Sequence, residues 1–305
     1  MIITLTGNNS FAIRQRLNEL TCDFVSKYGE LALEKFDGEE DEAVAIIEGL
    51  QSLPFLAQQK LVVVRSGGLN KELAEHVEQI ISSIGETTNA VFYEPQVDKR
   101  TAYFKVLKNQ TMFEEFNELD HQSLAKWLVD QTNFQGATLE RGDANYLIER
   151  VGTNQTLLVN ELNKLLTYKL EVTRASIDLL TEPTSHSKVF DLLDMAFSGN
   201  KKRALKLYDE QRAQKVEPQL IIGMIAWQLQ LIALAKNAGK RTPSQIAADS
   251  GMKAYPIEKA RGLASRLSND GLKNLVTEAL SIDYKSKTTP LDLDEALKNY
   301  IVVTL

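Results

Sequence analysis

The first part of the chain alternates short apolar runs with stretches in which apolar residues recur at helical spacing. An uninterrupted apolar run such as Leu61–Val64 is typical of a strand that is buried on both faces. Right-handed crossovers between such strands place them parallel in one sheet with helices on its faces. The predicted strands are Ile2–Leu5, Leu31–Phe36, Leu61–Val64 and Ala90–Tyr93, and the predicted helices between them lie near 10–24, 43–50 and 71–84.

After about residue 120 the apolar spacing is helical, and we expect no further strands. The segment Glu182–Ser185, which contains Pro183, has the composition of a linker. The pattern therefore predicts an α/β domain over residues 1–137, a small helical domain over 138–183 and a larger helical domain over 184–305. The helices predicted here are His121–Phe134, Glu140–Val151, Gln155–Tyr168, Thr173–Leu180, Ser187–Phe197, Lys201–Gln214, Pro218–Lys236, Pro243–Asp249, Ile257–Leu267, Gly271–Lys285 and Leu291–Val303.

The composition, with 43% hydrophobic and 25% charged residues, is that of a folded protein. The net charge of -6 argues against a nucleic-acid binder, because such proteins usually present a basic surface. The charge is unevenly spread, however. Residues 1–183 hold 17 Lys and Arg against 28 Asp and Glu, whereas residues 184–305 hold 18 against 13. The C-terminal part is therefore mildly basic.

Cysteine and histidine usage excludes several kinds of site. Cys22 is the single cysteine, so neither an internal disulfide nor a thiolate zinc site can form. We expect Cys22 to pack in the core, because it lies on the apolar side of a helical pattern. His76, His121 and His186 have no metal-ligand spacing. No metal and no cofactor are expected.

The sequence gives no positive sign of a signal peptide or of a transmembrane helix. The chain starts Met1-Ile2-Ile3 without the basic stretch and apolar run of a signal peptide. The longest apolar stretch, Leu220–Leu234, is interrupted by Gln228 and Gln230. We therefore expect a cytoplasmic protein with no membrane partner.

The first strand ends in Gly7 and leads into a helix, as the strand of a phosphate-binding P-loop does. The second glycine, the lysine and the Ser or Thr of that motif should then stand at positions 12 to 14. The chain has Ala12, Ile13 and Arg14 there. Glu94, after a predicted strand, is an isolated acidic residue where a nucleotidase often holds a metal-binding pair. Nucleotide hydrolysis by this chain is therefore not expected.

Leu53-Pro54-Phe55-Leu56 lies between a predicted helix and the predicted strand Leu61–Val64, in a loop or a short helical turn. Pro54 restricts the backbone, which lowers the entropy that the segment loses on binding. Large apolar side chains in such a connection favour contact with a partner if they face water. The alternative is that Leu53, Phe55 and Leu56 pack beneath the sheet.

Stretches along the whole chain resemble, in the same order, the delta subunit family of the bacterial DNA polymerase III clamp loader. These stretches are Ser52–Arg65, Asp98–Arg100, Glu149–Gly152, Asn160–Leu165 and Val189–Leu193. The resemblance implies an AAA+-like N-terminal domain with a RecA-type parallel sheet and no working P-loop, a helical lid and an all-α collar domain that mediates oligomerisation. These expectations match the division into 1–137, 138–183 and 184–305.

The same resemblance implies a subunit of the polymerase III holoenzyme that has no catalysis of its own. Its partners would be the beta sliding clamp, the motor subunits and delta-prime of the loader, and primed DNA within the complex. In the family, a hydrophobic pair inserts into the clamp and favours the open ring. Leu53 and Phe55 match that pair, and Pro54 and Leu56 belong to the same loop.

Two features of the C-terminal part leave alternatives open. Thr242–Ala260 loosely resembles a helix-turn-helix, which would suit a DNA-binding regulator, although few of its residues could read bases. Asp283 and Lys287 have the i, i+4 spacing of a surface helix pair, and the family resemblance suggests that Lys287 faces DNA. An AAA+ hydrolase with a divergent phosphate loop is the other alternative.

Overall fold

The computed structural model describes residues 1–55 and 57–304. The chain separates into two compact units, Met1–Leu119 and Asp120–Leu305.

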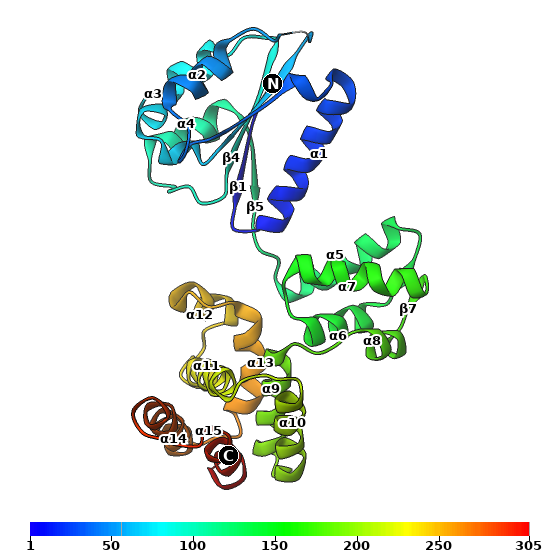
Figure 1. Ribbon diagram of the computed structural model, residues 1–305, viewed down its shortest axis with the longest axis vertical. Coiled ribbons are helices and arrows are strands. Elements are labelled where there is room, and N and C mark those ends of the chain that lie inside the picture. The colour runs from blue at the N-terminus through cyan, green and yellow to red at the C-terminus, as the bar shows by residue number, and fades with distance from the viewer. Residues whose placement is uncertain (56, 305) are drawn as a thin grey trace. The chain divides into compact units, whose positions relative to one another are not determined.

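The first unit is a five-stranded parallel sheet with the strand order β2-β3-β4-β1-β5 (Figure 1). Helix α1 covers one face of the sheet, and α2, α3 and α4 cover the other (Figure 1). The strands are β1 (Ile2–Gly7), β2 (Leu33–Asp37), β3 (Lys60–Arg65), β4 (Thr88–Glu94) and β5 (Met112–Phe116), and the helices are α1 (Ser10–Tyr28), α2 (Ala43–Gln51), α3 (Lys71–Ser83) and α4 (Ala102–Gln110), with short 3-10 turns at Glu30–Ala32 and Gly67–Leu69.

Burial on both faces of the sheet explains why the sequence of strand β3 is apolar without alternation. Leu61 and Val63 pack in the core beneath α1, whereas Val62 and Val64 pack in the core beneath α2 and α3. Successive side chains of a strand point to opposite faces, so a strand covered on both sides needs apolar residues at every position. The predicted α/β domain with a parallel sheet is thus confirmed.

Strand β5 and helix α4 were not among the predicted elements. Strand β5 lies at the edge of the sheet and pairs only with β1. Two of its five residues, Glu114 and Glu115, are charged, because an edge strand keeps part of its surface in water. The apolar pattern that revealed the inner strands is therefore missing here.

The second unit is mostly helical, as expected, apart from the two-residue strands β6 and β7, which pair in parallel. Helix α5 packs against α6 in this unit, although residues 121–134 fall within the predicted first domain. The division into residues 1–137, 138–183 and 184–305 stays a prediction. The elements are α5 (His121–Phe134), β6 (Thr138–Leu139), α6 (Arg141–Val151), α7 (Gln155–Tyr168), β7 (Glu171–Val172), α8 (Arg174–Leu180), α9 (Ser185–Phe197), α10 (Lys201–Ala213), α11 (Pro218–Lys236), α12 (Pro243–Ser250), α13 (Ala254–Ala264), α14 (Asn269–Thr288), α15 (Leu293–Asn299) and a final π-helical turn, Tyr300–Thr304.

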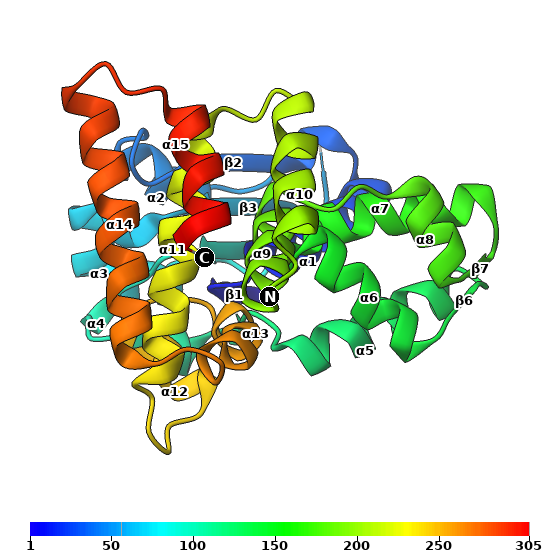
Figure 2. The ribbon, with the colours of Figure 1, turned by 90° about the horizontal axis from the view of Figure 1, so that it is seen from below.

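Helix α11 is the central helix of the C-terminal bundle, where it contacts α9, α13, α14 and α15 (Figure 2). Pro218 occupies its first turn, where the missing N–H costs nothing. Among the described residues, α11 is the one helix long and apolar enough to cross a membrane. Its apolar side chains, including Ile225 and Leu229, form the centre of the bundle core, as expected for the core helix of a helical domain.

Candidate functional site

Leu53 and Phe55 lie in the connection that leaves α2 after Gln51 and enters β3 at Lys60. Both side chains face solvent, with Leu53 80% and Phe55 82% exposed. Pro54 between them is half-buried. Leu56 lies outside the described residues. Packing beneath the sheet is therefore excluded for Leu53 and Phe55.

Exposed apolar side chains are unremarkable singly, and Leu31 and Phe134 are further examples, at 84% and 90% exposed. What distinguishes Leu53 and Phe55 is that only one residue separates them and that this residue is proline. Proline fixes its own backbone and restricts the residue before it to extended conformations. The two side chains are thus presented together by a segment with little backbone freedom.

Both ends of this connection are held by hydrogen bonds. At the first end, the Ser52 N–H donates to the Glu48 carbonyl at 2.8 Å and closes α2. At the second end, Asn89 Nδ2 donates to Gln59 Oε1 at 3.0 Å, and the Lys60 N–H donates to the Thr87 carbonyl at 3.0 Å. The segment that carries Leu53 and Phe55 is therefore held by hydrogen bonds at both ends.

The connection precedes a strand, so it lies at the amino-terminal edge of the parallel sheet, as does the N-terminus (Figure 1). Nucleotides in open α/β sheets bind at the opposite edge, beyond the carboxyl ends of the strands. The apolar pair is therefore separated by the length of the strands from the place where a nucleotide would bind.

At that carboxyl edge, β1 and α1 are joined only through Asn8 and Asn9. Asn9 caps α1, because its Oδ1 accepts from the Ala12 N–H at 3.0 Å, and its own N–H donates to the Phe116 carbonyl at 3.1 Å. A Cβ atom on Gly7, whose φ is +124°, would lie 1.9 Å from that same carbonyl oxygen. The close approach of β5 therefore explains why a glycine stands at position 7.

Glu94 ends β4 at the same edge, and its carboxylate is turned inward. The residue is 2% exposed, and its Oε1 accepts from the Tyr103 hydroxyl at 2.6 Å and from the Gly68 N–H at 3.2 Å. Burial raises the pKa of Glu94 to about 7, although both hydrogen bonds act in the opposite direction. The side chain therefore holds the Gly67–Leu69 turn after β3 in place.

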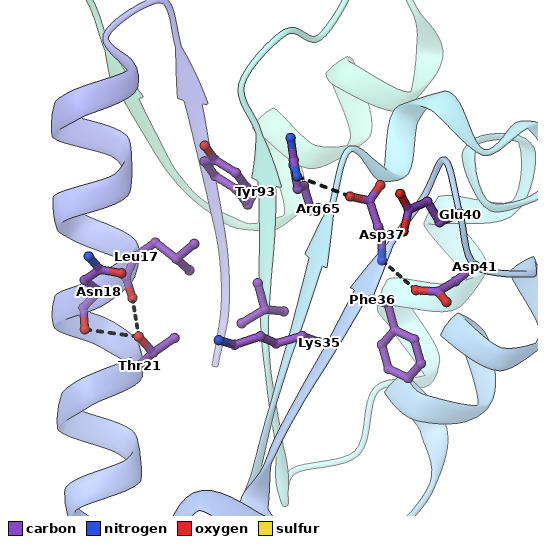
Figure 3. Close-up of a pocket in the computed structure, with 11 residues that line it drawn as sticks. Leu17, Asn18, Thr21, Lys35, Phe36, Asp37, Glu40, Asp41, Arg65 and Tyr93 are labelled. Atoms are coloured by element: carbon purple, nitrogen blue, oxygen red, sulfur yellow. Dashed lines mark hydrogen bonds and ion pairs between the residues drawn. The ribbon is translucent and has the colours of Figure 1, made fainter.

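A hollow of about 380 Å³ lies on the α1 face near the carboxyl ends of β2 and β3 (Figure 3). Three of its charged residues, Arg65, Asp37 and Asp41, are in contact with one another. Arg65 Nη1 lies 3.4 Å from Asp37 Oδ2, and Asp41 Oδ2 accepts from the Asp37 N–H at 2.7 Å (Figure 3). Neither Leu53 nor Phe55 lines it.

Lys287 lies in the last turn of α14, where its Nζ is 2.8 Å from Asp283 Oδ2. The expected i, i+4 pair is therefore present, and the Lys287 side chain is 60% exposed. Both residues line the rim of an apolar hollow of about 540 Å³ between α11 and α14.

The region has the outline of a helix-turn-helix, because α12 ends in a left-handed turn at Gly251 and α13 follows. The faces of α13, however, are used within the protein. Ile257 and Leu263 are buried in the bundle core, Lys259 lies over the Phe190 ring, and Tyr255 stacks on His121 with 4.2 Å between ring centroids. This packing leaves α13 little surface with which to read a DNA groove.

Cys22 is exposed, so the expectation that it packs in the core is wrong. Helix α1 packs on the sheet through a narrow stripe of Ile13, Leu17, Leu20 and Phe24, and Cys22, nine residues after Ile13, lies on the opposite side of the helix. Within residues 1–55 and 57–304, no cluster of His, Cys, Asp and Glu has the arrangement of a metal site.

Comparison with known proteins relates the chain to one family along most of its length. A family model described as DNA polymerase III, delta subunit matches residues 4–116, and one described as DNA polymerase III delta subunit, C-terminal domain matches residues 186–303. The DNA polymerase III subunit delta of Bacillus subtilis is 23% identical, with 100% of this chain and 92% of that protein aligned. A probable DNA polymerase III subunit delta from Aquifex aeolicus is 22% identical over 100% of this chain and 91% of its own length.

The fold agrees with these matches. The solved structure of the Bacillus subtilis DNA clamp loader delta protein superposes with a TM-score of 0.79 at 21% identity, covering 99% of this chain and 94% of that one. The chain therefore belongs to the DNA polymerase III delta subunit family.

Proposed function

We propose that this protein binds the beta sliding clamp through Leu53 and Phe55 and opens the ring for loading onto primed DNA. The observation that carries the proposal is the exposure of these two side chains beside Pro54 on a connection whose ends are fixed. Burying one such side chain in a partner contributes about 1.5–3 kcal/mol. That is the scale of an interface hot spot.

The mechanism is mechanical. A protein that binds the open ring more tightly than the closed ring shifts the ring toward opening by that difference in binding free energy. No covalent step is needed from this chain. The Asn9 cap and the close approach of Phe116 to Gly7 support a domain that takes no nucleotide, so the energy of ATP would enter through motor subunits.

The remaining parts of the proposal follow the three-domain division. Residues 1–137 would act as the AAA+-like clamp-binding domain, 138–183 as the lid and 184–305 as the collar that joins the motor subunits and delta-prime. Lys287, which is exposed in the mildly basic part of the chain, would face primed DNA. The protein would work in the cytoplasm, and Pro54 and Leu56 would complete the clamp-binding loop.

The test is co-migration of the purified full-length chain with the purified clamp on a size-exclusion column. The wild-type chain is expected to shift the clamp, whereas Leu53→Ala with Phe55→Ala is expected to leave it unshifted. The matched control is Leu179→Ala with Phe134→Ala, which truncates exposed side chains in the other compact unit. A clamp shift by the folded Leu53/Phe55 variant equal to that of the wild type contradicts the proposal.

A further inference from the structure

Lys60 is a buried lysine at the base of the clamp-binding connection. Its side chain is 2% exposed, and it is the first residue of β3, where the connection returns to the sheet. The ammonium group donates to the Gly49 carbonyl and to Ser52 Oγ, the latter at 2.8 Å, and Glu34 Oε1 lies 3.5 Å away.

The partners of this ammonium group lie where the connection begins. Gly49 is in the last turn of α2, where the carbonyl groups find no N–H donor within the helix. Ser52 is the residue that ends α2 and directly precedes Leu53. Lys60 therefore ties the residue before the exposed pair to the strand that follows it.

A buried ammonium is a costly way to fill space. Its lost hydration must be replaced by oxygen atoms, and a buried oxygen that loses this ammonium group is itself left without a donor. The positive charge at the end of α2 recovers part of the cost through the helix dipole. Lys60 thus fixes the geometry at the start of the connection by bonding to the Gly49 carbonyl and to Ser52 Oγ at once.

The neighbouring contacts leave the end of α2 little room to move. A Cβ atom on Gly49 would lie 2.4 Å from the Phe36 ring, so the helix end rests directly on β2. Gln51 Nε2 donates to Ser83 Oγ at 2.8 Å and links the same turn to α3. The exposed pair is therefore held relative to the sheet through the Lys60 contacts.

We propose that Lys60 is a positioning residue for clamp binding, holding Leu53 and Phe55 in the orientation in which they bind. The inference rests on the proposed function, because it concerns the same loop. Preorganisation lowers the entropy that side chains lose at an interface. Loss of the Lys60 contacts should weaken binding although Lys60 itself is shielded from the partner.

The first experiment compares full-length Lys60→Met with the wild type in clamp titrations and in urea unfolding. Methionine fills the space without the charge. We expect clamp affinity to fall by about tenfold or more in protein that stays folded, with some loss of unfolding stability because the Gly49 carbonyl and Glu34 lose their donor. Lys35→Met, an exposed lysine on the neighbouring strand β2, is the control and should bind as the wild type does. Unchanged affinity of Lys60→Met overturns the inference.

The second experiment asks whether Lys60 acts through the exposed pair. With Phe55→Ala already present, Lys60→Met should weaken binding by much less than it does alone, because there is less to position. Equal fold-losses in both backgrounds contradict the proposal. Ser52→Ala removes one acceptor of Lys60 at an exposed residue and should weaken binding in the same direction, which tests the idea if Lys60→Met does not fold.

The third experiment needs no clamp and separates this inference from the proposed function. Backbone order parameters at Ser52 and Phe55, from nitrogen-15 relaxation, should fall in Lys60→Met relative to both the wild type and Lys35→Met. Unchanged order parameters overturn the inference even if the clamp binds. If the wild type fails to bind the clamp, the proposed function fails, and lower order parameters still support Lys60 as the anchor of this connection.

Discussion

Buried polar side chains, as much as the exposed pair, determine what the α/β unit can do. Leu53 and Phe55 face water, whereas Lys60 and Glu94 are nearly inaccessible and bond to backbone groups. Sequence reasoning identified Leu53 and Phe55 from their place in a connection, and it singled out Glu94 for its position after a strand. Lys60 could not be found in this way, since a lysine next to a turn reads as an exposed residue.

Glu94 makes the stability of the protein depend on pH. Its pKa is raised by burial from 4.5 to about 7, so between these values the folded protein holds a proton that the unfolded chain has released. The stabilisation is complete below pH 4.5 and is lost as the pH rises through 7, amounting to about 3 kcal/mol for such a shift. Glu94→Gln, which keeps an oxygen for Tyr103 and Gly68, should remove this part of the pH dependence.

Urea unfolding at pH 5 and pH 8 measures the effect. The wild type should lose about 2.5 kcal/mol more of its unfolding free energy between these pH values than Glu94→Gln does, because part of the full effect has already been lost at pH 5. Glu115→Gln, at an exposed residue paired with Lys99, is the control, and it should leave this loss largely in place. Identical pH profiles for the wild type and Glu94→Gln rule out the titration of Glu94 as the cause.

At the scale of elements, the sequence predicted the inner strands and most helices because each has a clear apolar period. β3 is apolar throughout, and α7 and α11 begin and end where the pattern predicts. Edge strand β5 escaped prediction, because its Glu114 and Glu115 break any alternation. The two-residue strands β6 and β7 are too short to leave a pattern.

The pairing of β1 with β5 depends on Gly7. Its φ of +124° is rarely adopted by other residues, and an added Cβ atom would meet the Phe116 carbonyl oxygen at 1.9 Å. Gly7→Ala should therefore destabilise the protein by about 2–3 kcal/mol or more in urea unfolding. Gly85→Ala, where a Cβ atom meets nothing within 4 Å, should cost far less. Similar stabilities of the two variants contradict the packing role of Gly7.

At the scale of the whole molecule, the net charge of -6 is the sum of the charges of an acidic N-terminal part and a mildly basic C-terminal part. The proposed clamp binding through Leu53 and Phe55 would rely on apolar burial, which needs no positive field. Contacts with DNA phosphates depend on Lys and Arg side chains, and the affinity they provide falls steeply as the salt concentration rises. The distribution of charge is therefore compatible with a clamp-binding N-terminal part and a DNA-facing C-terminal part in a larger loader.

Lys287 provides the test of that second role. In a reconstituted loader, Lys287→Glu should lower DNA-dependent activity and reduce the salt dependence of DNA binding by about one unit of log–log slope. Lys285→Glu reverses the charge of another lysine in the last turn of α14 and serves as the control. If both variants change the salt slope equally, or neither does, Lys287 has no specific contact with the DNA backbone.

The central claim, that Leu53 and Phe55 bind the sliding clamp, is tested most directly by the dissociation constant between the full-length protein and the purified clamp. Truncation of both side chains to alanine should raise it by about a hundredfold or more, since each burial contributes about 1.5–3 kcal/mol. The Leu179→Ala, Phe134→Ala control should bind like the wild type. A folded Leu53→Ala, Phe55→Ala protein that binds the clamp with wild-type affinity would contradict the account.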